Sequence, residues 1–251
     1  MRKLMLSTVI VLAAAAPASA ADVVVFCPGA VQSVVRGLVA EYQQKSGNVV
    51  RFEFGTAGAV AKKVAAGAAG DVVITTDKGL AALAKDGKVD PASIKNLGSM
   101  GVGVAVKAGA SKPDIHDVDA FKKSMLAARS ITYANPAQGG QSGIHVAHVF
   151  AELGLDKALA SKIQLRDRGP EGLKEVAKGD IQIGLGQISE ILANKDVVLV
   201  GPLPPAIQGA VTFSAGVHSG SHERAAAQSL IDLLTSPEAK AKFKAVGFVV
   251  D

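Results

Sequence analysis

Short apolar runs with β-branched residues alternate with amphipathic stretches along almost the whole chain. Residues 23–26 form a continuous apolar run, as expected of a buried central strand, and residues 32–45 carry their apolar side chains on one helical face. Strands that alternate with helices predict a mainly parallel sheet covered by helices on both faces. The expected fold class is therefore α/β.

The same periodicities assign most of the remaining residues to elements. Further strands are expected at residues 49–54, 72–75, 100–106, 130–133, 163–165, 181–185, 197–200 and 210–217. Further helices are expected at a segment that carries Val60 and Val64 and ends near Gly67, and at residues 77–85, 118–127, 144–153, 172–178, 189–193, 223–234 and 237–245. No internal repeat or low-complexity linker interrupts this order.

Two long strand-like stretches, residues 100–106 and 210–217, bracket a block that has strands and helices of its own. We interpret them as paired crossovers between two lobes. The expected division is a leader at 1–20, the first part of lobe one at 21–105, lobe two at 106–209, and a return crossover with the C-terminal helices of lobe one at 210–251. Two mixed sheets flanked by helices and joined by two hinge strands can close over a ligand.

The N-terminus has the pattern of a secretory signal peptide. Arg2 and Lys3 precede an apolar stretch at residues 4–16, and the small residues 18–20 follow it. This stretch is shorter than a membrane span requires, although an uncleaved anchor is the alternative. We expect export to the periplasm. Cys27 is the single cysteine, so an internal disulfide is excluded, and we interpret it as a small apolar residue at a strand end.

Composition narrows the possible functions. The 251 residues include eight Phe, two Tyr and no Trp, so recognition of sugars or bases by ring stacking is not expected. The formal net charge is +5 without a basic patch, which argues against nucleic acid as a partner. His145 and His148 lack further metal ligands nearby, and no nucleophile motif occurs. We expect no catalytic residues, no metal and no cofactor, and therefore a protein that is not an enzyme.

Ligands of open α/β sheets bind beyond the carboxyl ends of the strands, where helix N-termini present free amides. Four segments have this position: residues 27–30, 55–58, 135–143 and 184–189. They contain glycine, amide and hydroxyl groups and no aromatic ring, which suits a small anion. Two of these segments also have a simpler interpretation, since Thr56 can cap the next helix and residues 135–143 can be a plain connection.

Two arginines follow the strand expected at 163–165. Arg166 and Arg168 flank Asp167 and can bind a carboxylate or an oxyanion in a bidentate manner. The alternative is a solvated charged loop.

A resemblance to a known family rests on these segments. Phe54-Gly55-Thr56-Ala57-Gly58 with the helix after it, Ala69-Gly70-Asp71 before an apolar strand, and Asn135-Pro136 before a glycine-rich turn resemble the periplasmic molybdate-binding proteins of ABC importers, which are type II solute-binding proteins. The resemblance covers nearly all of the mature chain. It implies the two-lobed periplasmic-binding-protein fold (type II), a molybdate- or tungstate-like oxyanion between the lobes, and delivery to an ABC permease by what we expect to be a monomer.

The chain departs from this family at three ligand positions. Ala30 stands where the family has a serine, Gln187 stands where it has a tyrosine, and Arg168 adds a positive charge. Arginine favours a small organic carboxylate or another oxyanion, which is the alternative ligand, and a ligand-sensing role is the alternative use. The expected ligand-binding residues are Gly29, Ala30, Val31, Thr56, Ala57, Gln141, Ser142, Arg168, Gly169 and Gln187.

Overall fold

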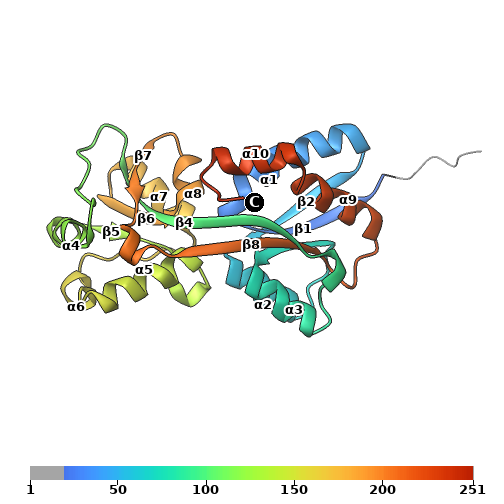
Figure 1. Cartoon of the computed structure of the whole chain (residues 1–251), viewed down its shortest axis with the longest axis horizontal. Coiled ribbons are helices and arrows are strands. Elements are labelled where there is room, and N and C mark those ends of the chain that lie inside the picture. Colours follow the sequence, from blue (N-terminus) through green and yellow to red (C-terminus); the bar gives the residue numbers. More distant parts are fainter. Residues whose placement is uncertain (1–19, 251) are drawn as a thin grey trace, which may run out of the picture.

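The computed structural model describes residues 20–250, and its course is shown in Figure 1. Residues 1–19, which contain nearly all of the predicted signal peptide, lie outside the described residues. Within residues 20–250, no helix has both the length and the apolar character needed to cross a membrane.

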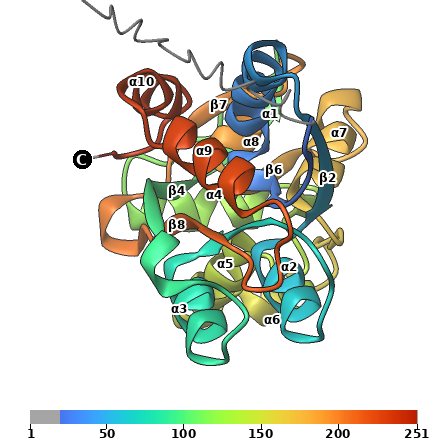
Figure 2. The same ribbon diagram turned by 90° about the vertical axis from the view of Figure 1, so that its right-hand side faces the viewer.

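Besides the first half of β4 (Lys95–Lys107), the sheet of lobe one has three parallel strands and one antiparallel strand. These strands are β1 (Asp22–Pro28), β2 (Val49–Gly55), β3 (Val72–Thr76) and the antiparallel β8 (Ala210–Val217). One face is covered by α1 (Gly29–Ser46), α9 (Arg224–Leu234) and α10 (Pro237–Ala245), and the other by α2 (Ala57–Ala65) and α3 (Asp77–Lys85), as Figure 2 shows. The parallel, helix-covered sheet is the arrangement expected from the alternating sequence.

Lobe two has a smaller mixed sheet. Its strands are the second half of β4 (Lys95–Lys107), β5 (Ile131–Thr132), β6 (Ile183–Gln187) and β7 (Val197–Pro202). Its helices are α4 (Val118–Ala127), α5 (Gln141–Glu152), α6 (Asp156–Leu159), α7 (Gly169–Lys178) and α8 (Ile188–Leu192). The first three pack with one buried cluster, whereas α7 and α8 pack with another.

Strand β4 belongs to both sheets. Its residues 95–101 pair with β8, and its residues 102–107 pair with β6 and β7. The strand order β2-β1-β3-β8-β4-β6-β5 therefore runs through both lobes, and the predicted α/β architecture with two mixed sheets is confirmed.

The buried clusters separate at the crossovers. Side chains before residue 101 and after residue 212 form two of them, and side chains between residues 102 and 203 form the other two. The exact lobe boundaries stay a prediction, which this separation supports.

The sequence-based boundaries are wrong at several helix starts. Helices α1, α5 and α7 begin at Gly29, Gln141 and Gly169, three residues earlier than expected in each case. Glycine and proline near these starts gave the appearance of loops, although the first turn of a helix tolerates both. The strand expected at 163–165 is also wrong, because this segment forms only one isolated bridge, between Ile163 and Ile131.

Candidate functional site

The four predicted segments meet at one pocket between the lobes. Nine of the ten predicted residues line it: Gly29, Ala30, Thr56, Ala57, Gln141, Ser142, Arg168, Gly169 and Gln187. The tenth, Val31, lies in the core of lobe one and does not line the pocket. The structure thus brings together residues that are more than 150 positions apart in the chain. Their contact with a ligand stays a prediction.

Helix N-termini surround the pocket: β1, β2 and β6 lead almost directly into α1, α2 and α8, whereas α5 and α7 follow longer connecting segments. Helices α1, α2, α5, α7 and α8 all begin there, and only α2 is capped by a side chain, that of Thr56. The first amides of the other four helices have no side-chain acceptor. Unpaired amides and the positive ends of helix dipoles favour an anion.

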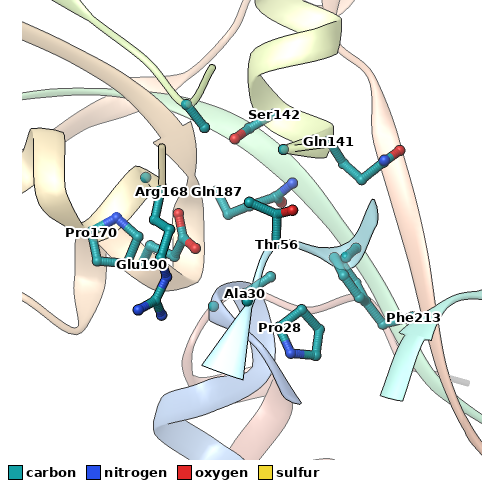
Figure 3. Close-up of a pocket in the computed structure, with 16 residues that line it drawn as sticks. Pro28, Ala30, Thr56, Gln141, Ser142, Arg168, Pro170, Gln187, Glu190 and Phe213 are labelled. Atoms are coloured by element: carbon teal, nitrogen blue, oxygen red, sulfur yellow. The ribbon is translucent and has the colours of Figure 1, made fainter. Parts of the chain in front are cut away.

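Two uncharged polar side chains face the same space (Figure 3). Ser142 is buried, and its hydroxyl makes no hydrogen bond within residues 20–250. Gln187 is 4% exposed, and its Oε1 atom has no hydrogen-bond partner. A buried amide oxygen without a donor costs about 1–3 kcal/mol, so a ligand group that donates a hydrogen bond to it gains stability.

Arg168 is the one cation that lines the pocket within the described residues. Its Nη2 atom donates to Oε1 of Gln32, 3.3 Å away on α1. Arg166 turns away and donates from Nε to Oε1 of Glu175 at 2.8 Å. The two arginines therefore do not act as one clamp, and only Arg168 is available to a ligand.

Sequence reasoning missed Glu190, which is the one carboxyl group that lines the pocket within the described residues. Figure 3 shows it beside Arg168. It makes no hydrogen bond or ion pair within residues 20–250. Burial raises the pKa of Glu190 to about 7, and the nearby positive charge of Arg168 lowers this pKa by a smaller amount.

Two glycines leave the space that Glu190 occupies. A Cβ atom on Gly29 would lie 2.3 Å from Oε1 of Glu190, and a Cβ atom on Gly169 would lie 2.3 Å from its Oε2. Both glycines are the first residues of their helices, so the carboxyl group lies against two helix N-termini. In the sequence, the one feature that could have pointed to Glu190 as a site residue is its position in the first turn of a helix.

The lobes touch each other across the pocket. The Thr56 hydroxyl donates to the carbonyl oxygen of Gln138 and accepts from the amide of Ala59, so it serves as a cap and a contact between lobes. On the other side, the Ser189 hydroxyl donates to the carbonyl oxygen of Ala30 at 2.6 Å. The structure is therefore a closed arrangement.

The pocket opens into a larger groove. The inner pocket has a volume of about 30 Å³, and the groove has a volume of about 1070 Å³. Gly29, Arg168, Pro170 and Glu190 line both spaces. The other charged residues of the groove are Arg36, Lys107, Lys174, Lys178, Lys195, Glu171 and Asp196, so it is mainly basic.

Three other features bear on the predicted chemistry. Phe213 of β8 lines the pocket, so the site contains one ring that the four segments did not show.

His145 bonds to the carbonyl oxygen of Ile207, and His148 pairs with Glu152, so the two rings do not point at a common ion. Cys27 is buried at the end of β1, where burial raises the pKa of its thiol and keeps it unreactive.

Two lobes of this topology, closed over a pocket of helix N-termini, define the class of solute-binding proteins. The profile of the family described as "Bacterial extracellular solute-binding protein" matches residues 23–249, and the chain belongs to this family.

The chain is similar to proteins whose names indicate different activities. The chain is 30% identical to an aconitate isomerase from Pseudomonas sp over 86% of this chain and 82% of that protein. It is 25% identical to the molybdate-binding protein ModA of Escherichia coli (strain K12) over 91% of this chain and 89% of that protein. The structure resembles the Azotobacter vinelandii periplasmic molybdate-binding protein with a TM-score of 0.76 at 22% identity, covering 92% and 99% of the two chains. The chain is a solute-binding protein of this molybdate-binding type in fold and family.

Proposed function

We propose that this protein captures a small organic polycarboxylate between its lobes in the periplasm and delivers it to an ABC permease. The observation that carries the proposal is that Arg168 lines, together with Glu190, a pocket whose other lining residues are uncharged. An arginine offers a planar fork of donors that fits a carboxylate. The family and its periplasmic members support the location and the partner.

A fully ionised tetrahedral oxyanion fits this pocket less well. Ala30 cannot offer the hydroxyl group that the molybdate-binding family has at this position. The inner pocket is small, with a volume of about 30 Å³, and suits one carboxylate group of a ligand whose remainder lies in the larger groove.

The groove provides room for the rest of such a ligand. Because Arg168 lines both spaces, a ligand with one carboxylate in the inner pocket can place its other carboxylates near the basic side chains of the groove. A molecule of several carboxylates thereby meets positive charge along its length, which increases both affinity and association rate.

A second candidate function is isomerisation of an unsaturated polycarboxylate, as the name of the Pseudomonas relative indicates. The specific observation in its favour is Glu190, a carboxyl group without a hydrogen-bond partner that lines the pocket and has a pKa of about 7. Groups with such a pKa can exchange protons at neutral pH.

Thermal unfolding of the mature protein with a panel of anions tests the proposal. The panel contains cis- and trans-aconitate, citrate, molybdate, tungstate, sulfate and phosphate. We expect at least one polycarboxylate to raise the apparent stability by about 4 kcal/mol at a thousandfold excess over its Kd. The proposal would be contradicted if molybdate and tungstate raised the apparent stability and no polycarboxylate did.

The variant Arg168→Ala separates this site from nonspecific charge effects. It should abolish the rise caused by the polycarboxylate. Arg129→Ala, which removes an exposed arginine of the same lobe that does not line the pocket, is the matched control and should keep the rise.

A further inference from the structure

Glu190 lies where the inner pocket meets the groove, because it lines both spaces. The inner pocket is surrounded by the amides of helix N-termini, and the groove is mainly basic. A polycarboxylate with one carboxylate anchored among the amides would have its next carbon atom at this junction. That carbon would therefore lie opposite the carboxyl group of Glu190.

We propose that Glu190 is a catalytic residue that moves a proton between two carbon atoms of a bound unsaturated polycarboxylate. This inference rests on the proposed function, since it requires that a polycarboxylate bind in the pocket. It adds a chemical step and assigns that step to one side chain.

The step balances within the ligand and Glu190 alone. The ionised carboxylate takes a proton from the methylene carbon next to the anchored carboxylate. The electron pair of the broken C–H bond forms a new double bond to the neighbouring carbon, while the electron pair of the old double bond moves to the carbon beyond. That third carbon takes the proton back from Glu190, so the double bond has moved by one position without an oxidant or a reductant.

The surrounding groups fit the charge that develops in this step. When the proton leaves, negative charge builds up on the oxygens of the anchored carboxylate, where the uncapped amides at the start of α5 are available as donors. Donors placed at developing charge are a major source of rate enhancement. Arg168 adds a positive charge on the same side.

Glu190 is also available to transfer a proton. It is held by no hydrogen bond or ion pair within residues 20–250, and Arg168 is the one other ionisable side chain among the described residues that line the inner pocket. Its pKa of about 7 keeps both the acid and the base forms present at neutral pH. The thiol of Cys27 cannot replace it, because burial raises the pKa of that thiol.

Proton exchange into deuterated water provides the test. Wild-type protein is mixed with trans-aconitate in D₂O, and ¹H NMR follows both the loss of the methylene signal and the appearance of the cis isomer. Calorimetry measures the affinity of the same samples. The variants are Glu190→Gln, which keeps the size of the side chain, and the control Glu152→Gln, which changes an exposed carboxylate of the same lobe.

We expect exchange with wild type and with Glu152→Gln, and a loss of at least about a hundredfold with Glu190→Gln while the affinity changes by less than about tenfold. If wild type binds trans-aconitate and neither the cis isomer nor exchange appears, or if Glu190→Gln forms the cis isomer at the wild-type rate, the catalytic role is overturned and the binding function stands. If no polycarboxylate binds at all, the proposed function fails first.

Discussion

The pocket depends on glycine at two positions where any side chain would meet Glu190. Gly29 and Gly169 begin their helices and allow the carboxyl group to lie against the backbone. At the residue scale, the shape of the pocket thus depends on the absence of a side chain at these two glycines as well as on the side chains that line it.

Replacement of Gly29 by alanine tests this arrangement. The new Cβ atom would lie 2.3 Å from Oε1 of Glu190, and the flexible side chain would move away. We expect ligand affinity to fall by at least about tenfold, while the free energy of unfolding changes by less than about 1 kcal/mol. Gly37→Ala is the matched control, because nothing lies within 4 Å of its Cβ position on the same helix. Equal affinities of the two variants would contradict the arrangement.

The pKa of Glu190 predicts a pH dependence of stability. Because burial raises this pKa from 4.5 to about 7, the folded protein binds a proton that the unfolded chain releases between these values. The contribution of this carboxyl group to the free energy of unfolding is therefore complete below pH 4.5 and is lost as pH rises through 7. Urea titrations measure the free energy of unfolding at pH 5 and at pH 8, and in the wild type this free energy should decrease over the range. In Glu190→Gln the decrease should be smaller by up to about 3 kcal/mol. An equal decrease in the wild type and in Glu190→Gln would show that the carboxyl group is solvated in the folded protein.

At the scale of elements, the pocket is closed by direct contact between α2 and the turn that precedes α5. The Gly58 amide donates to the carbonyl oxygen of Gly139 at 3.1 Å, and a Cβ atom on Gly58 would lie 2.7 Å from Cα of Gly139. Two backbones can approach this closely only where both residues lack a side chain.

Gly58→Ala should therefore hold the lobes apart. We expect the affinity for a polycarboxylate to fall by about tenfold or more, and the ligand-free unfolding temperature to stay equal or rise slightly, since alanine favours the helix. Fluorescence or calorimetric titration measures the affinity. Wild-type affinity in this variant would show that ligand binding does not require the contact.

The elements could be predicted from the sequence because helix and strand periodicity depend on local pattern. Helix α3 and strand β8 were predicted at their observed bounds. Asp71, part of the family pattern, proves to be structural: its carboxylate accepts from the amide of Val24 at 2.8 Å and from the hydroxyl of Ser221 at 2.6 Å. The site was less predictable, because Glu190 is distinguished from a solvent-exposed glutamate only by contacts with Gly29 and Gly169, which come from distant parts of the chain.

At the scale of the whole molecule, we propose that the basic groove guides the approach of an anion. Its basic side chains outnumber its acidic ones, so a polycarboxylate is attracted before it reaches the pocket. Such attraction acts on the association rate and is screened by salt.

Stopped-flow measurements should show the association rate constant for a polycarboxylate falling severalfold between about 20 mM and about 500 mM salt. The double variant Lys174→Gln with Lys195→Gln should weaken this dependence and leave the dissociation rate nearly unchanged. Lys122→Gln with Lys123→Gln, on α4 and outside the groove, is the control. A salt dependence that is the same in all three proteins would exclude the groove as the route of approach.

The central claim is that the closed pocket selects a polycarboxylate over a tetrahedral oxyanion. Isothermal titration calorimetry of the mature protein with trans-aconitate and with molybdate, in the same buffer at pH 7, tests it most directly. We predict that the Kd for trans-aconitate is lower than that for molybdate by at least about a hundredfold, or about 2.7 kcal/mol. Tighter binding of molybdate, with trans-aconitate weak or silent, would contradict the account.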